Sequence, residues 1–86
     1  MENIIQKQWE EKDDKLYKVV IFKDFNEAFA FMIKVAFLAE KYNHHPKWTN
    51  EWNKVEIWLW THDVGNDITE KDRHMAKQID ELLGLA

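Results

Sequence analysis

Alternating hydrophobic and polar positions predict two well-formed β-strands, at residues 15–22 and 54–61. In the second of these, Val55, Ile57 and Leu59 recur at every other position, which is the period of side chains that share one face of a sheet. The first strand carries apolar residues on both faces, so we expect both of its sides to be partly covered. A weaker strand precedes each of them. The weaker strands are expected over residues 4–10 and 48–52.

A helix is predicted over residues 25–41. Asp24 stands directly before it and Glu27 follows three positions later, a pair that resembles a capping box for the free amides of the first turn. Residues 28–39 are apolar at every position except Lys34, which is wider than the single stripe of a surface helix. We therefore expect one side of this helix to face the sheet and the other to face a neighbouring helix or subunit.

A second helix is predicted from its cap at Thr69 to Leu83, directly before Gly84. The apolar residues of this segment recur at helical spacing, at Ile68, Met75, Ala76, Ile79, Leu82 and Leu83. The element order is then strand, strand, helix, strand, strand, helix. This order predicts an α+β fold in a single domain over residues 1–86, a four-stranded antiparallel sheet with both helices packed on one face.

Composition narrows the partners that the chain can have. It carries 12 basic and 16 acidic residues, a formal net charge of -4, without a basic stripe, so direct binding to nucleic acid or to an anionic membrane lacks an electrostatic basis. Cysteine is absent, which excludes disulfides, thiolate zinc sites and thiol nucleophiles. The first residues lack the basic start and long apolar run of a signal peptide, so we expect a cytoplasmic location.

Large aromatic side chains are unusually frequent, with five tryptophans and five phenylalanines in 86 residues. Trp58 and Trp60 fall on the outward face of their strand, where they need a ligand or a subunit to cover them. A domain of this size buries only about 60% of the surface of its unfolded chain, so association would stabilise it. We expect a homodimer or a homotetramer.

Three of the four histidines gather at two loop positions. His44 and His45 follow the first helix, which Pro46 ends because proline disfavours helical conformation at the preceding residue. His62 comes directly after Thr61 at the end of an apolar strand. Imidazole gives or takes a proton near neutrality, so clustered histidines indicate proton transfer or metal ligation. Adjacent histidines cannot easily bind one metal ion, and no His-x-x-x-His pair occurs, so proton transfer is favoured.

Short segments spread over residues 9–86 form a specific combination of a His-His-Pro loop, a Thr-His strand end and an acidic helix start. The segments are Phe22-Lys23-Asp24-Phe25-Asn26, Ala39-Glu40-Lys41, His44-His45-Pro46-Lys47-Trp48, Trp52-Asn53-Lys54-Val55, Thr61-His62 and Thr69-Glu70-Lys71-Asp72. In these segments the sequence resembles the pterin-4a-carbinolamine dehydratases, also called 4a-hydroxytetrahydrobiopterin dehydratases.

The resemblance implies a lyase reaction, the dehydration of 4a-hydroxytetrahydrobiopterin to quinonoid dihydropterin during tetrahydrobiopterin recycling. It implies catalytic roles for His44, His45 and His62 in the pterin site, with Asp72 of the second helix in support. The remaining candidates are expected to bind the substrate, and they are Glu40, Asn43, Pro46, Trp48, Trp60, Thr61 and Asp63.

The reaction gives a chemical reason for these residue types. Loss of water needs a proton delivered to the departing hydroxyl and a proton removed from the adjacent ring nitrogen, which one protonated and one neutral imidazole can perform. Positioned groups of this kind are typically worth about 10² to 10⁴ in rate, and no metal or organic cofactor is expected. A carboxylate beside one imidazole would fix its tautomer, a role for Glu40 or Asp72.

Each candidate also has a plainer interpretation. The adjacent histidines could be solvated loop residues beside a helix C-terminus, Asp72 could serve only as a cap, Glu40 could be a surface residue and Trp48 a packing residue. The alternative function is a non-catalytic protein-binding module, because relatives of this family act as transcriptional cofactors or assembly factors. The apolar two-sided helix and the outward tryptophans would then supply the contact surface.

The sequence departs from the family at informative places. Asn43 stands where animal members tend to carry aspartate, and Trp60 replaces a small polar residue. A tryptophan there could narrow the pocket or stack on the pterin. Only about eight residues precede Trp9, where many members have a helix, so the quaternary arrangement is open.

Overall fold

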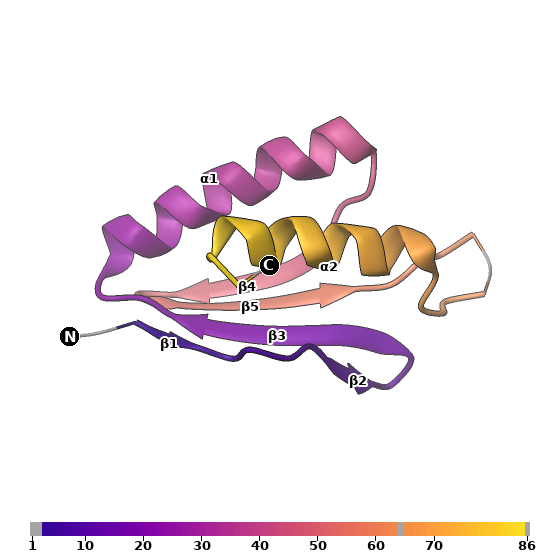
Figure 1. The fold of residues 1–86 in the computed structure, drawn as a ribbon, viewed down its shortest axis with the longest axis horizontal. Coiled ribbons are helices and arrows are strands. Elements are labelled where there is room, and N and C mark those ends of the chain that lie inside the picture. The colour runs from indigo at the N-terminus through magenta and orange to yellow at the C-terminus, as the bar shows by residue number, and fades with distance from the viewer. Residues whose placement is uncertain (1–2, 64, 86) are drawn as a thin grey trace.

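The computed structural model describes residues 3–63 and 65–85. Its strands form one antiparallel sheet in the order β1-β3-β5-β4, with β2 also paired to β3, and both helices lie on the same face (Figure 1). The strands are β1 (Ile4–Ile5), β2 (Glu10–Lys12), β3 (Lys15–Ile21), β4 (Lys47–Glu51) and β5 (Lys54–Leu59), and the helices are α1 (Phe25–Tyr42) and α2 (Glu70–Leu82). The predicted α+β fold is confirmed.

The weak strand predicted at the N-terminus is divided into β1 and β2, which lie one after the other along β3. Between them the chain leaves the ladder, because Trp9 turns toward α2 and its indole nitrogen donates to Asp80 Oδ1 at 2.9 Å. Over residues 3–63 and 65–85 the sheet therefore has five strands rather than four. Asp13 and Asp14 form the turn between β2 and β3 with φ of 53° and 60°, the left-handed conformation that a tight hairpin requires.

Asp24 caps α1 as the sequence predicts, but the carboxylate of Glu27 pairs with Lys23 Nζ at 3.4 Å and does not complete a capping box. Asp24 accepts a hydrogen bond from the amide of Glu27 at 2.9 Å. At the other end Asn43 adopts φ 50°, and its amide donates to the carbonyls of the last helical turn. This left-handed residue stops the helix and turns the chain back toward the sheet.

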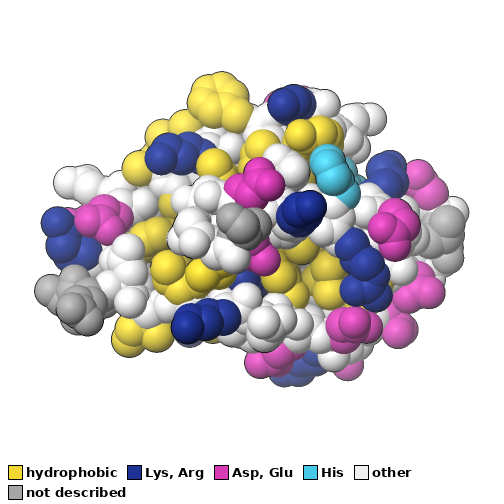
Figure 2. Space-filling view, viewed as in Figure 1, with side chains coloured by type: hydrophobic (Ala, Val, Ile, Leu, Met, Phe, Trp, Pro, Cys, Tyr) yellow, Lys and Arg dark blue, Asp and Glu magenta, His cyan; other side chains and the backbone are white. Residues whose placement is uncertain are grey.

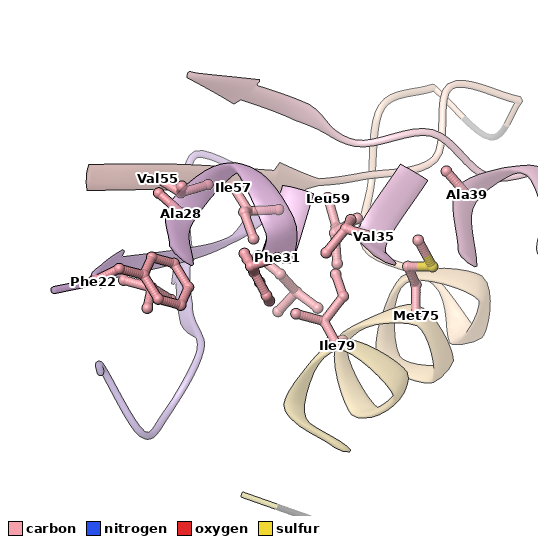
Figure 3. Close-up of a cluster of buried hydrophobic side chains, with 13 residues drawn as sticks. Phe22, Ala28, Phe31, Val35, Ala39, Val55, Ile57, Leu59, Met75 and Ile79 are labelled. Atoms are coloured by element: carbon pink, nitrogen blue, oxygen red, sulfur yellow. The ribbon is translucent and has the colours of Figure 1, made fainter. Parts of the chain in front are cut away.

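The hydrophobic core holds β5 against both helices (Figure 3). The inward residues of β5, Val55, Ile57 and Leu59, are fully buried, as their spacing predicts. The helices contribute Ala28, Phe31, Val35, Ala39, Met75, Ala76 and Ile79. Each large aliphatic side chain buried in this way contributes about 1.5 to 3 kcal/mol, so the relative positions of α1, α2 and β5 are strongly fixed.

The inward face of β3 carries a fully buried lysine, Lys18. Its ammonium lies 2.7 Å from Asp80 Oδ1, donates to the carbonyl of Lys7 at 3.2 Å and sits 5.1 Å from the ring centre of Trp9. These contacts replace the water that the charge loses on burial. They also tie the N-terminal segment and α2 to the same strand.

Helix α1 leaves a row of large apolar side chains uncovered on its side away from the sheet. This α1 ridge consists of Phe25, Phe29, Ile33 and Phe37, spaced four residues apart, with Phe37 72% exposed. Hydrophobic side chains accordingly line the edge of the molecule over α1 (Figure 2). Among the described residues, neither this helix nor α2 is long and apolar enough to span a membrane.

Candidate active site

His44 lies on the loop after α1 with its side chain turned into the protein. Its amide donates to the carbonyl of Ala39 at 3.0 Å, which holds the loop against the helix end. The residue is only 7% exposed, and its Nε2 lies 2.5 Å from Oδ1 of Asp72. Because a carboxylate accepts, this contact directs the Nε2 hydrogen toward Asp72 and leaves Nδ1 as the nitrogen available for proton exchange.

Asp72 is the centre of a buried hydrogen-bond network at the start of α2. It is fully buried, and its Oδ2 accepts from the amide of Thr69 and from the hydroxyl of Thr61, both at 2.8 Å. The two threonine hydroxyls lie 2.7 Å apart. The carboxylate therefore caps α2 and holds the ring of His44 at the same time.

His62 lies just past the end of β5 on an exposed loop. Thr61 exchanges backbone hydrogen bonds with Asp67 at 2.9 and 3.2 Å, which closes this loop beside the start of α2. The imidazole of His62 packs against the indole of Trp60 with ring centroids 4.8 Å apart. At the end of the strand, Thr61 therefore points into the hydrogen-bond network of Asp72 and His62 points toward solvent.

A pocket of about 250 Å³ lies between these loops. It is lined by Asn43, His44, His45, Thr61, His62, Asp63 and Lys71. The fold therefore brings the histidines of two distant segments to one hollow, with Asp72 behind one of them. A larger hollow of about 370 Å³ lies between the N-terminal segment and α2, but no histidine lines it.

His45 and several candidate substrate-binding residues are placed differently. The side chains of His45 and Glu40 are both exposed, with His45 Nε2 3.7 Å from Glu40 Oε1. The carboxylate of Glu40 therefore contacts His45 and not the buried His44. Trp48 is half-buried against the hydrophobic core. The pocket lining does not include Glu40, Pro46, Trp48 or Trp60.

Lys71 lines the pocket and was not singled out from the sequence. It lies one residue before Asp72 in the first turn of α2, in a segment whose sequence pattern is typical of a helix cap. The only available signal was its adjacency to Asp72. An ammonium in this position gives the pocket a cation that could hold an electron-rich group of a ligand.

Among residues 3–63 and 65–85, no group of three or more histidine, aspartate or glutamate side chains has an arrangement that could hold a metal ion. The pocket is lined by three imidazoles, the carboxylate of Asp63 and the ammonium of Lys71, and the buried carboxylate of Asp72 lies behind His44. This set can donate and accept protons, and the roles of the single residues stay predictions.

Comparisons with known proteins identify the family of the chain. Residues 1–82 match the family model described as "Pterin 4 alpha carbinolamine dehydratase". A putative pterin-4-alpha-carbinolamine dehydratase of Prochlorococcus marinus (strain MIT 9215) is 50% identical over 74 residues, which cover 86% of this chain and 76% of that protein. The pterin-4-alpha-carbinolamine dehydratase of Drosophila melanogaster is 49% identical over 72 residues, 84% of this chain but only 37% of that longer protein.

Solved structures give the same result. A transcriptional coactivator/pterin dehydratase from Brucella melitensis has a TM-score of 0.81 and 40% identity, with 85% of this chain and 79% of that chain covered. A pterin dehydratase-like protein, identified as a RuBisCO assembly factor in the alpha-carboxysome, has a TM-score of 0.80 and 25% identity, with 96% and 100% covered. From the family match, the close relatives and the shared fold, we conclude that the chain belongs to the pterin-4a-carbinolamine dehydratase family.

Proposed function

We propose that this protein is a lyase that dehydrates 4a-hydroxytetrahydrobiopterin to quinonoid dihydropterin and water. The observation that supports this most is the geometry of the pocket, in which the buried pair of His44 and Asp72 and the exposed His62 line one hollow or lie directly behind it. Membership of the family and the named activity of relatives support the same reaction.

The reaction needs two proton transfers. The bond between C4a of the pterin and its hydroxyl oxygen breaks, and the oxygen leaves as water after it accepts a proton. The adjacent ring nitrogen gives up its proton, and the electrons of that bond form the new double bond to C4a. One imidazole therefore starts protonated and the other neutral, and each ends in the opposite state.

His44 and His62 suit this pair because their environments differ. Asp72 holds the ring of His44 through Nε2, so Nδ1 can act toward a pterin in the pocket without a change of ring orientation. His62 is exposed, so water can restore its protonation state after each turnover. The exposed His45, which also lines the pocket, is assigned to the substrate site with a secondary role.

The proposal is tested by stopped-flow measurement of the dehydration of 4a-hydroxytetrahydrobiopterin. We expect the parent protein to accelerate the reaction and His62→Ala to lose about 10² or more of that acceleration, the lower end of what one positioned acid or base supplies. His74→Ala is the matched control, because His74 packs against Tyr42 and does not line the pocket. No acceleration by folded parent protein would refute the proposal.

A second function, binding to protein partners, is favoured by the α1 ridge. Four exposed apolar residues in one row are costly in water and suit a protein interface. A coactivator/pterin dehydratase and an assembly factor share this fold, which supports a partner for this chain also. We propose that the ridge first serves a homodimer or homotetramer, because a row at every fourth position can pack against a second copy of itself.

A further inference from the structure

We propose that Trp60 is a positioning residue that holds the imidazole of His62 in its working orientation. The inference rests on the proposed dehydratase function. The two rings lie with centroids 4.8 Å apart at an interplanar angle of 58°, a close tilted contact of the kind that aromatic pairs prefer.

The ring of His62 lacks the other restraints that hold His44. Nε2 of His44 is bound to Asp72 in the protein interior. Among the described residues, by contrast, His62 makes no hydrogen bond and no ion pair through its side chain. An exposed imidazole without a partner samples several rotamers, so the indole of Trp60 is the group that limits its choice.

The indole of Trp60 is itself held in place, so it can restrain the ring of His62. It follows β5 directly and is half-buried, and the ammonium of Lys15 on β3 lies 5.0 Å from its ring centre. On its other side Thr61 is fixed by its backbone pair with Asp67 and by its hydroxyl bond to Asp72. The backbone at the strand end is therefore rigid, and the freedom that remains at His62 is in its side chain.

The pocket lining excludes Trp60, although it includes the three residues that follow, Thr61, His62 and Asp63. An indole that does not line the pocket cannot contribute much to substrate binding, so any effect of Trp60 on catalysis must act through His62. The predicted signature is a change in kcat with little change in KM.

The test compares Trp60→Ala, Trp60→Phe and Trp58→Ala in the stopped-flow dehydration assay. Without the indole, the productive rotamer becomes one of about three, so kcat for Trp60→Ala should fall about threefold to tenfold while KM stays within about twofold. Trp60→Phe should recover most of the rate, because a phenyl ring can pack in the same place. Trp58→Ala is the matched control on the same strand face, where Trp58 packs on Tyr17 and lies away from the pocket.

A second measurement does not depend on activity. In the parent protein the indole ring current should displace the NMR signals of the His62 ring protons, and the displacement should vanish in Trp60→Ala and persist in Trp58→Ala. An unchanged kcat in Trp60→Ala beside an active parent and an inactive His62→Ala would overturn the positioning role and leave the dehydratase function intact. Unchanged His62 signals would overturn the contact itself, and a parent without activity would refute the function instead.

Discussion

Replacement of Asp72 by asparagine tests the catalytic role proposed for this residue apart from its structural role. The change keeps the shape of the side chain and removes its charge. Oδ2 accepts from Thr69 and Thr61, so the amide oxygen of asparagine will take that side, and the amide nitrogen will face Nε2 of His44. That nitrogen donates, so Nε2 must become an acceptor and the imidazole hydrogen moves to Nδ1.

The magnitudes follow from these contacts. With the wrong tautomer, His44 would lose the proton transfer proposed for it, which is worth about 10² to 10⁴ in rate, so kcat for Asp72→Asn should fall at least about 100-fold. The charged carboxylate accepts from His44, Thr61 and Thr69, and bonds to a charged group exceed neutral ones by about 1 kcal/mol each. We therefore expect the free energy of unfolding to fall by about 2 to 3 kcal/mol, which lowers Tm by about 8 to 24 °C for a domain of this size.

The assay is stopped-flow dehydration beside thermal unfolding, with Thr69→Ala as the control. Thr69→Ala removes a hydroxyl from the same network and should cost about 1 kcal/mol, but it leaves the contact between Asp72 and His44 in place, so activity should stay within about threefold. The reasoning is wrong if Asp72→Asn is destabilised and yet keeps the parent kcat, because Asp72 would then be a helix cap alone.

Three further changes test other parts of the account. Asp80→Ala leaves the buried Lys18 without its anion and should lower the free energy of unfolding in urea by about 3 to 5 kcal/mol. Addition of Lys18→Met should regain much of this loss. Equal stability of the parent and the Asp80→Ala variant would contradict the prediction. The hydroxyl of Tyr17 lowers the pKa of Glu56 from 4.5, while burial and then Glu56 raise the pKa of Tyr17 to about 12. The stability that the Glu56 carboxylate contributes is lost as pH falls below 4.5, and the stability that the neutral Tyr17 hydroxyl contributes is lost as pH rises from 10 to 12. Tyr17→Phe should therefore lower the free energy of unfolding by about 1 to 2 kcal/mol at pH 7 and by less at both pH extremes. A difference in stability between parent and variant that does not change with pH would argue against this pair. We expect the parent protein to sediment as a dimer or tetramer and Phe37→Glu, which places a charge on the α1 ridge, to sediment as one chain; equal masses for the two proteins would contradict the assignment of the interface to this ridge.

Much of the fold could be predicted because its signals are local. The alternation around Ile57, the cap at Asp24 and the break before Pro46 each depend on a few neighbouring residues, and each lies where it was expected. The division of the first strand could not be predicted, because it depends on the contact of Trp9 with Asp80, 71 positions away in the sequence. Tertiary contacts of this range leave no periodic trace in the sequence.

The candidate site was predictable in its residue types and less so in its geometry. The sequence offered either Asp72 or Glu40 as the carboxylate beside an imidazole, and the structure pairs Asp72 with His44. Glu40 lies near the exposed His45, because its position on α1 places it on the exposed side of the helix. Lys71 was missed because a helix start is already explained by its cap. The contact of Trp60 with His62 could not be predicted, because it depends on side-chain direction at the strand end.

The most direct test of the central claim is the dehydration rate of the His44→Ala, His62→Ala double variant beside each single variant, measured by stopped flow at matched concentration. The two histidines line one pocket, and the proposed mechanism gives them complementary proton transfers. We therefore predict that the double variant falls to the uncatalysed rate and that each single variant already approaches it. A folded double variant that retains the rate of the parent would contradict the assignment of acid and base catalysis to this site.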